Sequence, residues 1–281
     1  LDKLESIPGF QVNLSQHEIL KIANRIGIVI SGQTTSIVPA DKKLYELRDT
    51  TATVDSISLI ASSICSKKLA SGADAIVFDV KTGKGAFMKE QNDALYLAKL
   101  MVDIMEKSGK KSAALISDMN QPLGYAVGNY LEVIEASNTL QGKGPKDLEE
   151  ICLVLGSLML VLGGKADNID TARMSLVKSL KTGAAFNKFL EFIEAQGGSA
   201  DIIKNGVFPS PCVKCELTVK SEKSGYIKEI DTEKIGFASM LLGAGRRTKE
   251  DSIHPLAGIV IKKKIGDPVK ANEPLAILYT N

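Results

Sequence analysis

Short uninterrupted apolar runs alternate with longer stretches of helical periodicity, and this alternation constrains the fold more than any other feature. The runs occupy residues 27–30 (GIVI), 75–80 (AIVFDV) and 113–118 (AALISD), with helical stretches at 54–70 and 89–108. Strands that are covered on both faces read as continuous apolar runs rather than alternating ones. Strands that alternate with helices are typical of a parallel sheet. The sequence therefore predicts an α/β fold with a mainly parallel, mixed sheet flanked by helices.

Helix boundaries are marked by local signals in several places. Ser15 precedes Glu18 by three residues, which is the spacing of a capping box, and apolar residues at helical period follow up to Ile26. Gly27 is expected to end that helix. Further helices are predicted over residues 123–137, 146–163 and 168–196.

The pattern changes near residue 208, where prolines are followed by short β-like segments. We expect strands at 215–220, 225–230 and 259–263 and one helical stretch near 231–242, so that residues 209–281 form a C-terminal α+β domain. Its glycine-containing strand phrases resemble the barrel-sandwich modules of biotin and lipoyl carriers. The Met-Lys-Met turn of those carriers does not occur in the sequence, which favours a small domain that only packs.

Composition and charge exclude several classes of function. The 35 Lys and Arg against 33 Asp and Glu leave a net charge of +2, so a nucleic-acid partner is not expected. The longest charge-free apolar run, residues 151–164, is shorter than the roughly 20 residues that cross a bilayer, so no membrane partner is expected either. Four cysteines are too sparse for a disulfide scaffold and indicate a cytoplasmic protein. The chain begins with Leu1 in the middle of an amphipathic phrase, and we expect it to be incomplete.

The densest group of chemically useful residues lies in residues 45–70. Arg48 ends a short helical turn, and on the next helix Ser63 and Lys67 are four residues apart, which places a hydroxyl and an ammonium on one face. Small neighbours leave room for a flat ligand. Spacing alone leaves a second interpretation open, in which the lysine is solvated and the serine allows two helices to approach.

Two loop phrases follow predicted strands. They are residues 79–88 (DVKTGKGAFM) and 117–129 (SDMNQPLGYAVGN). Ligands of open α/β sheets bind at the carboxyl ends of strands. Neither phrase matches a phosphate-binding or dinucleotide-binding consensus, so plain connecting loops remain the alternative. Pro122 suits the first turn of a helix, along which Glu135 would lie.

Other candidate sites are weaker. Cys212 and Cys215 have the spacing of half a zinc site, but no second pair exists, and structural thiols are favoured. His17 and His254 are too few and too far apart to support a histidine-based triad. The phrase 243–247 (GAGRR) suits an anion, although a solvated loop is favoured.

Several phrases together resemble the pyrimidine nucleoside phosphorylases, the family that includes thymidine phosphorylase. They are LDKLESIPGF, ADKKLYELRDTTATVDS, SSICSKKLASGADAIVFDVKTGKGAFM, SDMNQPLGYAVGN and LGAGRRTKEDSI, and the likeness runs through essentially all 281 residues. It is nearest to the broad-specificity bacterial type that accepts uridine, thymidine and deoxyuridine. The resemblance implies a cytoplasmic homodimer with a small helical lobe and a large α/β lobe. On this basis we expect a core domain of residues 1–42 and 74–208 and a helical-lobe segment of residues 43–73.

The resemblance also implies roles for individual residues. Arg48, Ser63 and Lys67 match the positions that hold the pyrimidine ring, with Arg48 and Lys67 as the catalytic pair. Cations aimed at the oxygens of the ring stabilise the negative charge that the base gains as it leaves. Potassium is the implied cofactor. Leu123 and Ala126 would bind it through backbone carbonyls and Glu135 through its carboxylate, since hard oxygen ligands suit a hard cation.

The sequence departs from the family at the phosphate site. Family members carry a Lys-His-Ser-Thr-Gly-Gly loop and a glycine-rich Ser/Thr segment for phosphate, the co-substrate, upstream of the point that matches Leu1, and neither occurs in the sequence. No phosphate-binding residue is therefore assigned. Two alternatives stay open: a catalytically incomplete fragment or binding module, and a related nucleotide phosphorylase or phosphoribosyltransferase.

Overall fold

The computed structural model describes residues 1–32, 38–50, 53, 56–205, 215–248 and 250–281. Within 38–50 it describes only the backbone of residues 42, 45, 46 and 48–50. The chain forms two compact units that interleave along the sequence. Unit 1 comprises residues 1–32, 121–150 and 178–281, and unit 2 comprises residues 33–120 and 151–177.

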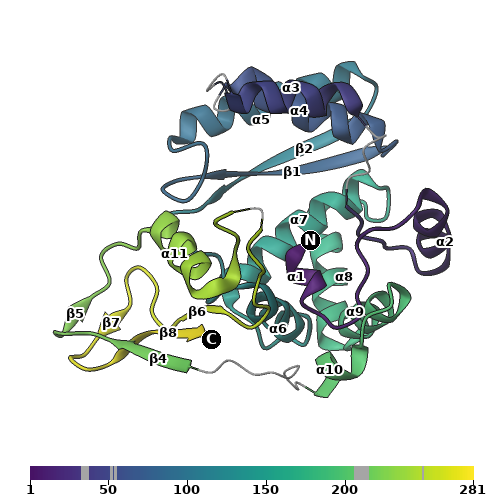
Figure 1. Cartoon of the computed structure of the whole chain (residues 1–281). Helices are drawn as coiled ribbons and strands as arrows, with labels where there is room; N and C mark the ends of the chain where they lie inside the picture. The colour runs from purple at the N-terminus through teal and green to yellow at the C-terminus, as the bar shows by residue number, and fades with distance from the viewer. Residues whose placement is uncertain (33–37, 51–52, 54–55, 206–214, 249) are drawn as a thin grey trace. The chain divides into compact units, whose positions relative to one another are not determined.

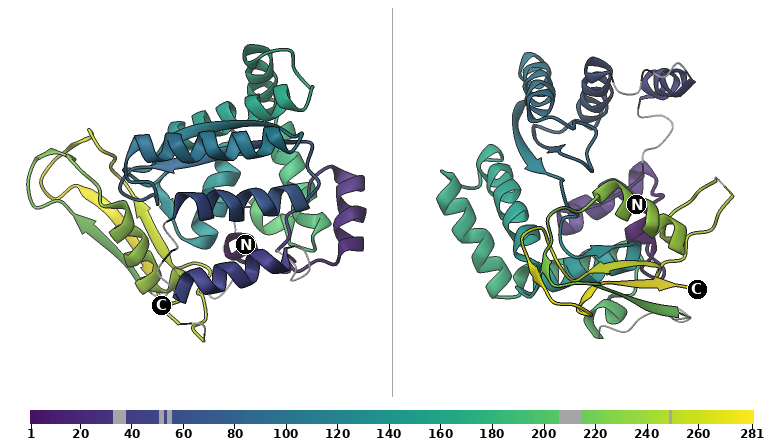
Figure 2. Two further views of the ribbon diagram at one scale, coloured as in Figure 1. Left: turned by 90° about the horizontal axis from the view of Figure 1, so that it is seen from above. Right: turned by 90° about the vertical axis from the view of Figure 1, so that its left-hand side faces the viewer.

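Unit 2 is built on a pair of parallel strands, β1 (Ala75–Thr82) and β2 (Lys111–Asp118), joined by α5 (Gln91–Lys107). Helices α4 (Ile57–Ala70) and α5 lie side by side over this strand pair (Figures 1 and 2). The predicted strands at 75–80 and 113–118 and the helices at 54–70 and 89–108 are confirmed where the structure describes them. The α/β fold class is likewise confirmed.

One side of β1 forms the apolar core of unit 2. Ile76, Phe78 and Val80 point into a cluster with buried residues of α4 and α5, such as Ala61 and Met105. The intervening residues of β1 are more exposed, so the strand buries one face far more than the other. This burial fixes which side of α4 faces the strands and which side is left for polar residues.

The remaining helices of unit 2 come from two stretches of chain. Helix α3 (Pro39–Thr50) contacts α4. Most of α7 (Lys146–Leu162) and α8 (Ile169–Lys181) also belong to this unit. The two helices approach closely at Gly156, where the lack of a side chain leaves room for Leu176. A Cβ at Gly156 would lie 2.9 Å from a methyl group of Leu176.

Unit 1 has a helical core that joins the start of the chain to its later part. Ile7 and Phe10 pack with Tyr130, Phe192 and Ile193. The helices of this unit are α1 (Asp2–Glu5), α2 (Gln16–Ile26), α6 (Asn129–Leu140), α9 (Ala184–Ala195), α10 (Ala200–Asn205) and α11 (Thr232–Ser239), the last continued by the π-helical turn η1 (Met240–Ala244).

The strands of unit 1 are antiparallel. A four-stranded sheet has the order β3-β6-β8-β4, and β5 pairs with β7. The bounds are β3 Ala126–Val127, β4 Cys215–Lys220, β5 Gly225–Tyr226, β6 Gly258–Ile261, β7 Pro268–Val269 and β8 Pro274–Thr280. The strand predicted at 215–220 is confirmed with the same bounds as β4, and those predicted at 225–230 and 259–263 are confirmed as the shorter strands β5 and β6. The helix predicted near 231–242 is confirmed as α11.

The structure corrects three predicted elements. Residues 27–30 form no strand, because Ile30 bonds through its N–H and its carbonyl to the side chain of Gln196 instead of to a neighbouring strand. The helix predicted over 123–137 begins only at Asn129, after a loop in which Gly124 has a left-handed φ of +69°. The helix predicted over 168–196 is two helices, because Gly183 adopts φ +74° between them.

The capping box was predicted correctly. Ser15 Oγ accepts the backbone N–H of Glu18, and the Glu18 carboxylate accepts the backbone N–H of Ser15 at 2.8 Å. Gly27 ends α2 in a left-handed conformation. Among the described residues, no helix is long and apolar enough to cross a membrane.

Candidate active site

The face of α4 that adjoins its apolar side carries the predicted hydroxyl and ammonium. Ser63 is buried, and Lys67 Nζ donates a hydrogen bond to Ser63 Oγ at 2.8 Å. Packing of Ala61 and Cys65 into the core of unit 2 sets the rotation of the helix that places them there. The structure thus brings together two of the three residues predicted to hold a ring.

The ammonium of Lys67 has a second partner that the sequence analysis missed. Asp41 Oδ2 lies 2.9 Å from Lys67 Nζ, and the Asp41 side chain is only 11% exposed. Asp41 stands in the first turn of α3, whereas Lys67 stands in the last turn of α4. The one sequence signal for such a partner is an aspartate two residues after the proline that opens the helix.

Arg48 lies on α3, and its side chain is outside the described residues. It follows Asp41 by seven residues, nearly two helical turns, so the backbone places both positions on one face of α3. Because α3 contacts α4, the predicted ring-binding residues belong to adjacent helices of one unit.

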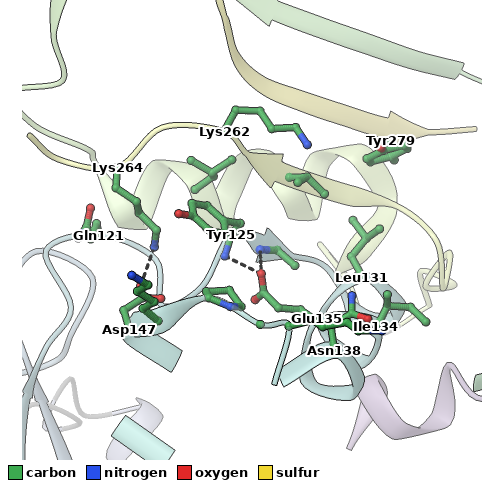
Figure 3. A pocket seen from close by; sticks show the side chains of 17 residues that line it. Gln121, Tyr125, Leu131, Ile134, Glu135, Asn138, Asp147, Lys262, Lys264 and Tyr279 are labelled. Carbon is green, nitrogen blue, oxygen red and sulfur yellow. Dashed lines mark hydrogen bonds and ion pairs between the residues drawn. The ribbon is translucent and has the colours of Figure 1, made fainter. Parts of the chain in front are cut away.

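The three residues predicted to hold potassium come together in unit 1. Glu135 on α6 accepts the backbone N–H of Tyr125 at 2.7 Å and of Ala126 at 3.1 Å, both on Oε1 (Figure 3). Gly124 makes this approach possible, since a Cβ there would lie 2.1 Å from Glu135 Oε2. The carboxylate is therefore held against the loop of residues 123–126, which carries the other two predicted ligands.

Burial dominates the electrostatics of Glu135. Desolvation raises the pKa of its carboxyl above the ordinary value near 4.5, while the hydrogen bonds from Tyr125 and Ala126 and the charge of Lys264 oppose this rise. Lys264 Nζ pairs with Asp147 Oδ2 at 3.0 Å and lies 5.2 Å from the centre of the Tyr125 ring (Figure 3). These residues line a pocket of about 830 Å³.

The loop phrases after β1 and β2 also meet. Lys81 Nζ lies 2.7 Å from Asp79 Oδ2 and donates to Ser117 Oγ at 2.9 Å, and the Ser117 hydroxyl donates to Asp79. Further along, the backbone N–H of Lys84 donates to Asn120 Oδ1 at 3.1 Å. The carboxyl ends of both strands therefore carry a connected set of polar groups, as expected of that edge of a parallel sheet.

The weaker candidates do not assemble into sites. His17 and Cys215 are exposed, and Cys212 lies outside the described residues. Arg246 pairs with Asp2, and Arg247 pairs with Asp251. In the part of the chain that the structure describes, no group of three or more His, Cys, Asp or Glu is arranged to hold a metal ion.

Comparison with known proteins defines the class. Residues 1–186 match the family model described as the glycosyl transferase family, a/b domain, and residues 226–281 match the pyrimidine nucleoside phosphorylase C-terminal domain. The chain therefore belongs to the glycosyl transferase family that this a/b domain defines, and its last part matches the C-terminal domain of the pyrimidine nucleoside phosphorylases.

Curated relatives are similar along the whole chain. The pyrimidine-nucleoside phosphorylases of Geobacillus stearothermophilus and Bacillus subtilis are each 53% identical over 283 residues, and that of Staphylococcus aureus is 51% identical. These alignments cover 100% of the chain and 65% of each relative. The chain thus spans a little under two thirds of the length of the curated relatives it matches.

Proposed function

We propose that the full-length protein catalyses the phosphorolysis of pyrimidine nucleosides. Uridine, thymidine or deoxyuridine reacts with phosphate, the glycosidic C–N bond breaks, and the products are the free base and ribose or deoxyribose 1-phosphate. The observation that carries the proposal is the Lys67–Ser63 pair on α4, with Asp41 beside it, in a chain 53% identical to enzymes of that name.

The chemistry of the base explains the choice of residues. A uracil or thymine edge has two carbonyl oxygens flanking an N–H, so cationic donors and a hydroxyl suit it. As the C–N bond breaks, the base gains negative charge, and an ammonium already aimed at a ring oxygen stabilises the transition state more than the ground state. We assign Lys67 and Arg48 this catalytic role and Ser63 the role of binding the ring.

A single substitution tests the assignment. Lys67→Ala in the full-length protein should lower kcat/KM for uridine phosphorolysis by about 100-fold or more, because one preorganised donor is lost. Lys68→Ala is the matched control, since Lys68 is the exposed neighbour on the same helix turn. Phosphate-dependent release of uracil, followed by absorbance, measures both variants. Wild-type turnover by Lys67→Ala would refute the role of the ammonium.

We further propose that the loop of residues 123–126 and Glu135 form part of a potassium site. The donor set fits the ion, because a carboxylate and backbone carbonyls are hard oxygen ligands. The pKa of Glu135 is raised by desolvation, and a bound cation would offset the penalty of burying its charge. Leu123 and Ala126 would contribute carbonyl oxygens, and the ion would hold the loop in place.

Thermal unfolding tests the ion site without reference to activity. Potassium chloride should raise the melting temperature of the wild type more than sodium chloride does at equal ionic strength, and Glu135→Gln should abolish the difference. Equal effects of the two salts on the wild type would contradict the assignment.

The family relationship also supports a homodimer that works in the cytoplasm, as part of this proposal. Sedimentation of the full-length protein tests the assembly. A single species at the mass of two chains is expected, and a monomer at micromolar concentration would contradict it.

A further inference from the structure

We propose that Asp41 is a positioning residue that holds the Lys67 ammonium in the orientation needed for the leaving base. This inference rests on the proposed function and extends it to a residue of α3. Its basis is the ion pair of 2.9 Å between Asp41 Oδ2 and Lys67 Nζ, together with the hydrogen bond of 2.8 Å from the same nitrogen to Ser63 Oγ.

A lysine needs such partners because its ammonium sits on a flexible four-carbon stem. Oxygens of two different residues, Asp41 and Ser63, hold the ammonium from two directions. The Asp41 side chain is 11% exposed and that of Lys67 is 34% exposed, so the pair is shielded more than an ordinary surface ion pair. The lysine is oriented before any ligand arrives.

The helices themselves favour this arrangement. Asp41 stands at the positive end of the α3 dipole and Lys67 at the negative end of the α4 dipole, so each charge is stabilised by its own helix. Position 48 lies on the same face of α3 as Asp41. The contact between Asp41 and Lys67 therefore also ties the helix that carries Arg48 to the helix that carries Ser63.

The sign of the charges decides what Asp41 contributes. A carboxylate beside the ammonium weakens the positive potential that the leaving base meets, so direct electrostatic stabilisation of the base is not its role. Its contribution is orientation, which matters when charge develops on the base. Loss of Asp41 should accordingly lower kcat more than it raises KM.

A double-mutant cycle with Lys67 separates positioning from a general effect on folding. In the full-length protein, Asp41→Ala should lower kcat/KM for uridine by about 10- to 100-fold, the range typical of losing a hydrogen bond to a charged group. In a Lys67→Ala background the same substitution should change kcat/KM less than about twofold, because Asp41 then has no ammonium to orient. If steady-state turnover of the double variant is too slow to measure, the rate of uracil release in a single turnover, with enzyme in excess over uridine, completes the cycle.

Two further variants control the experiment. Asp93→Ala removes an exposed aspartate from the first turn of α5, so it reports the loss of a helix-terminal charge alone and should leave kcat/KM unchanged. Asp41→Asn keeps the size and one acceptor oxygen, and it should recover most of the activity lost in Asp41→Ala.

Each outcome bears on the inference. Equal losses from Asp41→Ala with and without Lys67 would overturn it, since Asp41 would then act independently of the ammonium. Wild-type activity of Asp41→Ala beside an impaired Lys67→Ala would overturn it while leaving the proposed function standing. Wild-type activity of Lys67→Ala would instead remove the proposed role of the ammonium, and the positioning role of Asp41 with it.

Discussion

The side chain of Gln196 makes the hydrogen bonds to Ile30 that a partner strand would make if residues 27–30 formed a strand. This predicts how much Gln196 contributes to the stability of the segment. Gln196 is 1% exposed. Its Oε1 accepts the N–H of Ile30 at 2.9 Å, and its Nε2 donates to the carbonyls of Gln11 at 2.7 Å and Ile30 at 2.8 Å. One amide group thus satisfies three backbone groups on two segments of unit 1. Gln196→Met keeps the volume and removes all three bonds.

The size of the effect follows from these contacts. At about 1 kcal/mol for each hydrogen bond, three bonds amount to about 3 kcal/mol. If the Ile30 amide exchanges by local opening of its segment, a loss of about 3 kcal/mol makes its exchange roughly 100-fold faster than in the wild type. Hydrogen exchange followed by mass spectrometry measures it in a peptide that covers residues 28–31. A peptide from β1, in unit 2, is the internal reference and should not change.

Gln141→Met is the matched control. The Nε2 of Gln141 also donates to a backbone carbonyl, that of Ser137, but at 3.3 Å on a half-buried helix end. Its loss should cost less than about 0.5 kcal/mol. Equal exchange at residues 28–31 in Gln196→Met and in the control would refute the argument that Gln196 replaces a strand.

Three other outcomes are expected. Burial raises the pKa of Glu135, so the folded state binds this proton more tightly than the unfolded state does. The free energy of unfolding therefore falls as the pH rises from about 4.5 through the folded pKa of Glu135. Glu135→Gln should flatten that part of a pH–stability profile measured in urea without potassium, and an unchanged slope would contradict it. Ser63→Ala should raise KM for uridine several-fold with a smaller loss of kcat, since we assign the serine to binding; an unaltered KM would count against this role. Gly124→Ala should lower the melting temperature by several degrees, because its Cβ would lie 2.1 Å from Glu135 Oε2 at a φ of +69°, and wild-type melting would show that the loop adapts.

Signals within one stretch of chain predicted structure well. The capping box at Ser15 and Glu18 depends on residues three apart, and the strands at 75–80 and 113–118 show in their own apolar runs. The spacing of Ser63 and Lys67 likewise placed both side chains on one helix face, where they are hydrogen-bonded.

Predictions failed where a distant residue decides the local conformation. Residues 27–30 have the sequence of a strand, but the hydrogen-bond partner of Ile30 is Gln196, far along the chain. No residue of the run itself indicates this partner. The helix expected from residue 123 is excluded by Gly124, whose left-handed turn admits the carboxylate of Glu135. The pairing of Asp41 with Lys67 joins two helices, so no periodicity could reveal it.

The interleaving of the two units sets the order in which their cores can assemble during translation. The apolar cluster of unit 2 draws on residues 57–116, one continuous stretch that can condense soon after it leaves the ribosome. The cluster of unit 1 joins Ile7 to Ile193 and Leu256. At typical rates of synthesis, its first contributors wait on the order of tens of seconds for their partners. The early apolar segment around Phe10 is then exposed to chaperones, while the apolar cluster of residues 57–116 in unit 2 can already have condensed.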